Sequence, residues 1–446
     1  GEKVGVVNVH LYRPFLPEHL IKELPDSVQR IAVLDRTKEP GGADPLLLDV
    51  RNAFYGTKNA PLVVGGRYGL ASKDFTPDQV LAVFDNLKAE TPRDSFTIGI
   101  EDDVTHHSLP QPSATFIPVS NETFACKFWG YGSDGTVGAN KSAIKIIGDH
   151  TDMYAQAYFA YDSKKSGGLT VSHLRFGPRP IKSSYLVSKA DFVACHNQAY
   201  IGHYDMLADL KPGGIFLLNC MWTPEELERH LPADVKRAIA QKNVRFHIIN
   251  AVGIGREIGS RINMIMQAAF FRLTGIIPAE DAEKYLRDAV IKSYGKQGQA
   301  VIDMNFEAIR RGMTDSLSVT VPESWKHASE APVPRNPAMP AFIHDVVNPM
   351  NRQQGDALPV SAFADYADGH WPVGITAWER RGVAVYVPQW KPDSCIQCNQ
   401  CAYVCPHAVI RPRLLSSEET LAAPEGFRTV SAKGSDVKGL SFHLAI

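Results

Sequence analysis

Four cysteines in the last sixth of this 446-residue chain carry its most specific chemistry. They are Cys395, Cys398, Cys401 and Cys405, spaced Cys-x-x-Cys-x-x-Cys-x-x-x-Cys, and a proline follows the last one. Three thiolates in so tight a loop can ligate one [4Fe–4S] cluster, while the fourth, before the proline, ligates a second cluster. A zinc site would instead pair two Cys-x-x-Cys units across a longer spacer. The spacing therefore predicts one-electron transfer through iron–sulfur clusters.

A two-cluster arrangement requires a second loop of this kind, and the sequence after Cys405 contains no further cysteine. The chain also enters an apolar run at residues 4–9 directly after Gly1-Glu2-Lys3. We therefore expect an internal segment of a longer polypeptide, whose missing part completes the clusters.

A glycine-rich turn is the second feature with chemical meaning. Gly130, Gly132 and Gly135 lie between a predicted strand at 124–129 and a predicted helix, and their spacing matches the dinucleotide-binding fingerprint. Glycines let the backbone approach an anion, and the unpaired amides of a helix start point toward it. Gly132, Ser133, Asp134 and Gly135 are thus candidate phosphate-binding residues.

The next predicted strand, residues 154–161, leads into Asp162, Lys164 and Lys165. In a dinucleotide-binding unit an acid at this place suits a free ribose hydroxyl, whereas bases suit a ribose phosphate. The two lysines favour a ligand with an additional phosphate, such as coenzyme A or NADP. The alternative is an ordinary solvated lysine pair.

The composition is that of an ordinary globular protein, with 44% hydrophobic and 21% charged residues and a net charge of −1. No basic patch indicates nucleic acid, and no apolar run has transmembrane length. The remaining cysteines, Cys126, Cys195 and Cys220, lie in apolar contexts and are predicted to be buried and inert. We expect a cytoplasmic protein without disulfides and without nucleic-acid or membrane partners.

The elements that position these residues alternate between strands and helices, which predicts an α/β multidomain chain. In the first part, strands are predicted at 4–11, 30–35, 61–65 and 96–101, and a helix at 77–88. In the second, strands are predicted at 122–129, 154–161, 169–176, 192–195, 214–218 and 244–250, and helices at 261–274 and 279–294. A proline-rich connector follows, and a short strand at 383–389 leads into the cysteine loop.

Blocks along the whole chain resemble the single-chain 2-oxoacid oxidoreductase family of pyruvate:ferredoxin (flavodoxin) oxidoreductase. Besides the cysteine loop they are LYRPF (11–15), LDRTKEPG (34–41), GSDGTVGANK (132–141), YDSKKSGG (161–168), HLRFG (173–177), RINMIMQ (261–267) and PQW (388–390). The resemblance implies a transketolase-C-terminal-like α/β domain (1–118), a gamma-type α/β domain (119–320), an extended linking domain (321–385) and part of a two-cluster ferredoxin α+β domain (386–446).

What the resemblance implies for function is a division of roles. Cys395, Cys398 and Cys401 would hold one [4Fe–4S] cluster and Cys405 the second. The glycine turn, Lys164, Lys165 and Arg261 would bind coenzyme A; the role of Arg261 comes mainly from the resemblance, and the alternative is a helix-start arginine paired with a neighbouring carboxylate. Thiamine diphosphate and magnesium would bind outside this segment. The segment would then contain no catalytic residue and be inactive alone.

The family's reaction is the oxidative decarboxylation of pyruvate to acetyl-CoA, with ferredoxin or flavodoxin as electron acceptor and a homodimer as the assembly. Two alternatives stay open. One is a flavin- or NADP-linked dehydrogenase with a fused ferredoxin module, which the glycine turn allows. The other is a non-catalytic electron-transfer subunit.

Overall fold

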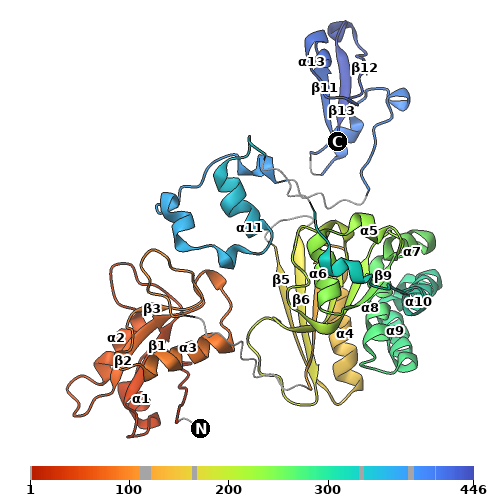
Figure 1. Cartoon of the computed structure of the whole chain (residues 1–446). Coiled ribbons are helices and arrows are strands. Elements are labelled where there is room, and N and C mark those ends of the chain that lie inside the picture. The colour runs from red at the N-terminus through yellow and green to blue at the C-terminus, as the bar shows by residue number, and fades with distance from the viewer. Residues whose placement is uncertain (1–2, 111–121, 163–167, 331–335, 380–385, 407) are drawn as a thin grey trace. The chain divides into compact units, whose positions relative to one another are not determined.

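The computed structural model describes residues 3–110, 122–162, 168–330, 336–379, 386–406 and 408–446. The chain divides into two compact units, Gly1–Val383 and Ala384–Ile446. Figure 1 labels many of the helices and strands of both units.

The first α/β region contains a parallel sheet in the order β1-β2-β3. Its strands are β1 (Arg30–Asp35), β2 (Leu62–Arg67) and β3 (Phe96–Thr97), and its helices are α1 (Pro17–Glu23), α2 (Pro45–Ala53) and α3 (Pro77–Lys88). The Asp35 carboxylate at the end of β1 accepts the amides of Leu46 and Leu47, both at 3.2 Å, in the first turn of α2. Helix α3 begins at a proline, as predicted, and Gln79 accepts the amide of its N-cap residue Thr76 at 3.1 Å.

Two strand predictions in this region need correction. Residues 4–11 form no strand, and their apolar side chains are exposed, Val6 at 83%. The run is apolar enough for a strand but pairs with no other described strand, and a strand without a partner leaves its backbone groups unsatisfied. The strand predicted at 96–101 ends at Thr97, before Gly99, whose φ is 74°.

The second α/β region is a seven-stranded sheet in the order β10-β9-β8-β7-β4-β6-β5. The strands are β4 (Phe124–Tyr131), β5 (Tyr154–Tyr161), β6 (Leu169–Gly177), β7 (Ala190–Cys195), β8 (Leu210–Asn219), β9 (Arg245–Ile249) and β10 (Leu317–Ser318). Strands β4, β7, β8 and β9 are parallel neighbours, whereas β6 runs antiparallel to both β4 and β5. The carboxyl ends of β4, β5, β7, β8 and β9 therefore lie at the same edge of this sheet.

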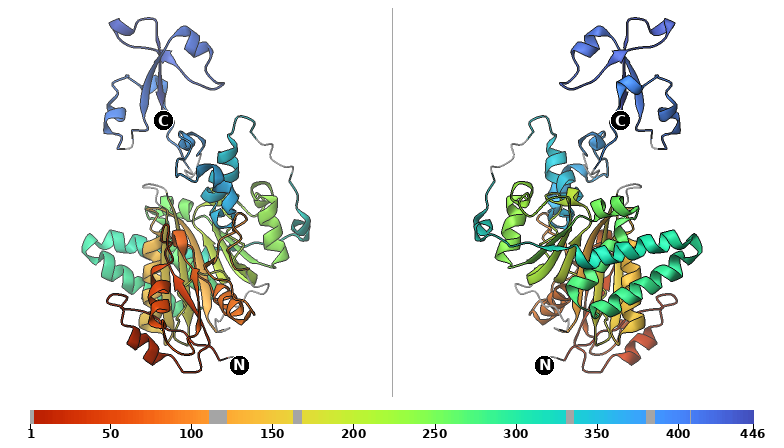
Figure 2. Two further views of the ribbon diagram at one scale, coloured as in Figure 1. Left: turned by 90° about the vertical axis from the view of Figure 1, so that its left-hand side faces the viewer. Right: turned by 90° about the vertical axis from the view of Figure 1, so that its right-hand side faces the viewer.

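Helices cover both faces of this sheet (Figure 2). They are α4 (Thr136–His150), α5 (Leu227–His230), α6 (Ala233–Gln241), α7 (Ala251–Ile258), α8 (Ile262–Thr274), α9 (Ala279–Tyr294) and α10 (Gln299–Thr314). Alternation along β4 sorts its side chains between two cores: Phe128 packs with α4, α7, α8, α9 and α10, and Trp129 packs with α6 on the other face. The α/β prediction is confirmed here, and the helix predicted at 279–294 has the observed bounds.

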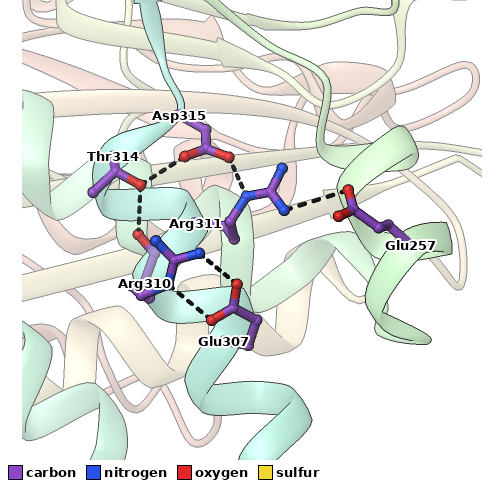
Figure 3. Close-up of polar contacts among 6 residues, drawn as sticks. All are labelled: Glu257, Glu307, Arg310, Arg311, Thr314 and Asp315. Atoms are coloured by element: carbon purple, nitrogen blue, oxygen red, sulfur yellow. Dashed lines mark hydrogen bonds and ion pairs between the residues drawn. The ribbon is translucent and has the colours of Figure 1, made fainter.

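Helix α10, which was not predicted, lies against α7 and α8. Gly312 allows the close approach to α8, because a Cβ at this position would lie 2.3 Å from the carbonyl oxygen of Ile265. Figure 3 shows the polar contacts at the end of α10. Arg311 pairs there with Asp315 and, at 3.3 Å, with Glu257 of α7. The end of α7 is thereby fixed to the helix layer.

The connector residues 336–379 form short helical turns, among them α11 (Asn348–Asn351), around the ring of Phe342 and the stacked rings of Tyr366 and Trp371. None of these described residues belongs to a named strand. The strand predicted at 383–389 falls partly outside the described residues, and residues 386–389 form no strand.

The second unit is a small α+β structure. It contains α12 (Gln400–Val404) and α13 (Ser417–Leu421), and an antiparallel sheet in the order β11-β13-β12, formed by β11 (Arg411–Leu415), β12 (Val430–Ser431) and β13 (Ser441–Ala445). Its interior is small: Phe442 and Leu444 are buried, and Trp390 packs edge-on against Phe442 with ring centroids 5.9 Å apart.

Candidate functional site

The cysteine loop lies at the start of the second unit. Cys398 and Cys401 are exposed, Cys395 and Cys405 are partly buried, and none of the chain's seven cysteines forms a disulfide. Gln397 and Asn399 have positive φ angles of 62° and 59°, so the backbone reverses between the first three cysteines. The left-handed conformation at Asn399 also starts α12, which carries Cys401.

The side chains of Gln397 and Lys433 hold the loop to the β12 end of the small sheet. The Gln397 amide donates to the carbonyl of Ser431 at 2.9 Å and accepts the amide of Lys433 at 2.8 Å. The Lys433 ammonium in turn donates to the carbonyl of Cys395 at 3.2 Å. A positive charge therefore lies beside the cysteine loop.

The residues present fit an iron–sulfur cluster by their chemistry. Four thiols with ferredoxin spacing, two of them exposed, are the soft donors that such clusters require. Within the described part of the chain, however, no group of three or more His, Cys, Asp or Glu side chains converges so that it could hold a metal ion. The sequence thus identifies a ligand set that this conformation does not gather.

The three scattered cysteines are buried, as predicted. Burial raises the pKa of Cys195 to about 12 and that of Cys220 to about 11, and it raises the pKa of Cys126 as well. Thiols that stay protonated near neutral pH are poor ligands and poor nucleophiles.

The glycine turn connects β4 with α4, as predicted, and Gly130 and Gly135 each have a structural reason. A Cβ on Gly130 would lie 2.6 Å from the Cβ of Thr136, so only glycine lets the helix start so close to the strand. Gly135, the N-cap of α4, has a φ of 92°. Ser133 has a φ of 76°, a strained value for a residue with a side chain.

Asp134 serves the backbone of the turn. Its carboxylate accepts the amide of Tyr131 at 2.9 Å and the amide of Thr136 at 2.7 Å. A carboxylate at a helix start stabilises the helix, but its negative charge opposes a bound anion. The Asp134 side chain is therefore unsuited to bind a phosphate, and the prediction for this turn concerns its backbone amides.

A pocket of about 310 Å³ lies beside the turn. Its lining comes from the end of β4, the glycine turn, the start of α4, the end of β5 and the start of β6, namely Tyr131, Gly132, Ser133, Asp134, Gly135, Val137, Gly138, Tyr161, Asp162, Gly168, Leu169 and Thr170. These segments meet because β5 ends, and β6 begins, at the sheet edge where β4 ends. The structure thus brings the glycine turn and Asp162 together.

The topology differs from a dinucleotide-binding unit in one respect. In that unit the first and second strands are parallel neighbours. Here β6 lies between β4 and β5 and runs antiparallel to both. Asp162 therefore approaches the turn across an intervening strand, because β5 and β6 pair along their full length.

The other candidate residues are placed unequally. Lys164 and Lys165 lie outside the described residues. Arg261 is the N-cap residue of α8, and it is exposed. Two residues later, Asn263 meets the glycine turn, since a Cβ on Gly135 would lie 3.0 Å from the Cβ of Asn263. Arg261 is therefore near the turn, although it does not line the pocket.

Three buried polar residues next to the turn were not predicted. The Thr136 hydroxyl lies 2.7 Å from Nδ1 of His196, and the side-chain amide of Asn219 donates to the His196 carbonyl at 2.8 Å. Burial lowers the pKa of His196. The local sequence gives no spacing signal for this set, because its members follow three different strands; a polar residue directly at the end of a buried strand is the one hint.

Four sequence families match successive parts of the chain. "Pyruvate:ferredoxin oxidoreductase core domain II" matches residues 1–80, and "Pyruvate ferredoxin/flavodoxin oxidoreductase" matches residues 125–314. A domain of unknown function matches residues 328–384, and a 4Fe-4S binding domain matches residues 387–410.

Curated relatives match over the whole chain. The pyruvate-flavodoxin oxidoreductase of Klebsiella pneumoniae is 58% identical and the pyruvate:ferredoxin oxidoreductase of Moorella thermoacetica is 54% identical, each over 100% of this chain. The chain spans 38% of the length of either relative. The mitochondrial pyruvate dehydrogenase [NADP(+)] of Euglena gracilis is 46% identical over 100% of this chain, which covers 25% of that protein.

A solved structure, the pyruvate oxidoreductase subunit PORC of Thermotoga maritima, matches 44% of this chain and 98% of its own length. Its sequence identity is 23% and the TM-score is 0.36.

Proposed function

The chain belongs to the pyruvate ferredoxin/flavodoxin oxidoreductase family, and we propose that the enzyme it is part of converts pyruvate and coenzyme A to acetyl-CoA and CO2. The electrons pass through [4Fe–4S] clusters to ferredoxin or flavodoxin. The observation that carries this proposal is the identity of 58% and 54%, over the full chain, to two relatives named for this chemistry.

In this proposal the second unit binds clusters. Cys395, Cys398 and Cys401 hold one cluster and Cys405 contributes to another; bound clusters supply carriers of single electrons. The side chain of Gln397 fixes the loop to the β12 end of the sheet, as its two hydrogen bonds indicate. This chain's own residues thus provide thiolates, a fixed loop and the nearby charge of Lys433.

The glycine turn binds the phosphates of coenzyme A. Support comes from the pocket of about 310 Å³ beside the turn and from the start of α4, where first-turn amides have no partner within the helix. Arg261 and the pair Lys164 and Lys165 supply positive charge. In this proposal residues 1–118 form a transketolase-C-terminal-like domain and residues 119–320 form a gamma-type domain. Thiamine diphosphate and magnesium bind outside this chain.

The proposal includes a homodimer and a cytoplasmic location, as the family resemblance implies. Among the described residues, no helix has both the length and the apolar character needed to cross a bilayer.

One finding favours a second candidate for the electron acceptor. A protein named pyruvate dehydrogenase [NADP(+)] contains a segment 46% identical to this chain over its full length. Proteins with a segment similar to this chain are thus named for flavodoxin or ferredoxin in two cases and for NADP(+) in another. A NADP-linked enzyme is therefore the alternative form of the same proposal.

The test uses the full-length protein from the natural source of this chain. We expect methyl viologen reduction that requires both pyruvate and coenzyme A, together with bound iron and acid-labile sulfide. Reduction of NADP without added ferredoxin would favour the alternative. Iron-free protein that retains the full activity would contradict both forms.

A further inference from the structure

We propose that Thr136, His196 and Asn219 form a buried positioning network that sets the affinity of the glycine turn for the phosphates of coenzyme A. The inference rests on the proposed function, because it takes the turn as the phosphate-binding element. The three residues do not line the pocket. They act through the start of α4.

The network begins at the first residue of α4. Thr136 is 1% exposed, and its hydroxyl lies 2.7 Å from Nδ1 of His196. Its side chain lies directly over Gly130, where no Cβ intervenes. The Tyr200 hydroxyl donates to the carbonyl of the same glycine at 3.3 Å. Both sides of the turn's first glycine are therefore held by buried hydrogen-bonding groups.

His196 connects this helix start to two strands. Its amide donates to the carbonyl of Trp129 in β4 at 2.8 Å, and its carbonyl accepts from the side chain of Asn219 at the end of β8. The imidazole is 4% exposed and packs edge-on against the ring of Phe128. A neutral imidazole has one donor and one acceptor nitrogen, and the Thr136 hydroxyl, which can donate or accept, can pair with Nδ1 in either tautomer.

Asn219 extends the network to a second helix. Its side-chain oxygen accepts the amide of Ala251, the first residue of α7, at 2.9 Å. Helix α7 ends beside the start of α8, where the amide of Ser260 donates to the carbonyl of Gly255 at 2.8 Å. Asn263 in the first turn of α8 then meets Gly135. The contacts thus return to the glycine turn from its other side.

Because of this arrangement, we expect the network to affect the binding of coenzyme A as well as the stability of the fold. Removing one member leaves a buried donor or acceptor unpaired, which costs roughly 1–3 kcal/mol. The strained element nearest to the network is the turn itself, where Ser133 has a positive φ. The cost is relieved most easily by moving the start of α4, and that movement displaces the amides that face the anion.

The test compares Thr136→Val with Thr136→Ser in the full-length enzyme. The valine variant removes the hydroxyl but keeps the shape, and we expect it to raise the KM for coenzyme A about tenfold while the KM for pyruvate is unchanged. The serine variant keeps the hydroxyl and is expected to restore the KM to within about twofold of wild type. Thr136→Ala, which also lacks the hydroxyl but is smaller, is expected to show the same split if the valine variant does not fold.

Thr151→Val is the matched control, because Thr151 lies at the other end of α4 and its hydroxyl donates to Ile147 at 2.6 Å. It is expected to lower the melting temperature without changing either KM. If Thr136→Val and Thr136→Ala lower only the melting temperature, as this control does, the network is structural alone and the inference is wrong.

A second variant separates failure of the inference from failure of the proposed function. Gly138 lines the pocket, and an added Cβ there meets no atom within 4 Å. Gly138→Asp therefore places a negative charge at the pocket without steric cost and should raise the KM for coenzyme A. An unchanged KM in this variant would overturn the coenzyme A assignment itself, and the inference with it. A raised KM in Gly138→Asp with an unchanged KM in Thr136→Val would overturn the network alone.

Discussion

The carboxylate of Asp134 accepts the amide of Thr136 at 2.7 Å, so an acidic side chain closes the start of the helix that the glycine turn opens. A charged side chain here serves the fold first, because the same carboxylate also accepts the amide of Tyr131. An anion at this helix start must therefore bind beside a fixed negative charge.

Asp134→Ala removes the two hydrogen bonds that the carboxylate accepts from the amides of Tyr131 and Thr136. Each bond to a charged acceptor contributes about 1.5–3 kcal/mol, so a lower melting temperature, corresponding to a loss of at least about 3 kcal/mol for the two bonds, is expected. The KM for coenzyme A should rise as well, because the turn loses its fixed shape. Asp152→Ala, an exposed acid beyond the other end of α4, is the control for both measurements. A lower KM with unchanged stability would mean that repulsion by the carboxylate outweighs its structural role.

Cys398→Ser and Cys405→Ser should affect different clusters of the full-length enzyme. The first removes a ligand of the cluster shared with Cys395 and Cys401, and the second removes a ligand of the other cluster. We expect loss of one distinct electron paramagnetic resonance signal in each variant, with a corresponding loss of iron. Cys220→Ala, at a buried thiol with a raised pKa, should retain all iron. Loss of the same signal in both serine variants would contradict the division of ligands.

Lys433→Gln removes the positive charge whose ammonium donates to the carbonyl of Cys395. A nearby cation favours the reduced, more negative cluster, so the midpoint potential should fall. The side chain is exposed and screened by salt, and we expect about a threefold change in the reduction equilibrium. Redox titration followed by electron paramagnetic resonance measures it. Lys438→Gln, on the same unit, should leave the potential as it is, and a rise in the Lys433 variant would refute the electrostatic argument.

His173 makes the stability of the sheet depend on pH. Burial, aided by the charges of Lys127 and Arg175, lowers its pKa to about 3, while the unfolded chain has the ordinary value near 6.5. Its contribution is fully present above pH 6.5 and is lost as the pH falls from there toward 3, because only the unfolded state takes up the proton. At pH 5 the loss is about 2 kcal/mol relative to pH 7.5.

His173→Asn should reduce this acid sensitivity, because asparagine does not titrate. Its side-chain oxygen retains an acceptor for the Val187 amide, which in the wild type donates to Nδ1 of His173 at 3.2 Å. Melting temperatures at pH 7.5 and pH 5 test the prediction. The drop between them should be smaller in the variant than in wild type. His327→Asn, at an exposed histidine, should show the wild-type drop. An equal drop in all three proteins would show that other groups dominate.

The sequence predicts elements well where burial is simple. Strand β5 and helix α9 have the predicted bounds, and β4, β6, β7, β8 and β9 lie within a few residues of the predicted positions, whereas the short strand β10 was not predicted. The strand prediction for residues 4–11 was wrong, because apolar composition alone does not supply a partner strand. Helix α10 was missed, since its contact with α8 depends on Gly312, a residue that alone indicates no helix.

The candidate site was also predictable only in part, because only some of its features depend on residues that are close in the sequence. Spacing identifies the cysteine ligands and the glycine turn, because their chemistry is local. The link between His196 and Thr136 joins residues sixty positions apart, and the approach of Asn263 to Gly135 depends on how α8 packs on α4. Sheet order also escapes local patterns, as the placement of β6 between β4 and β5 shows.

Asn219 uses one amide group for two elements, donating from nitrogen to the His196 carbonyl and accepting at oxygen from Ala251. Deamidation to aspartate would exchange that nitrogen for an oxygen and set two acceptors against each other in a dry interior. A change of about one mass unit would thus break the contact between Asn219 and His196, and with it the link between the starts of α4 and α7, while the bond from Ala251 would remain.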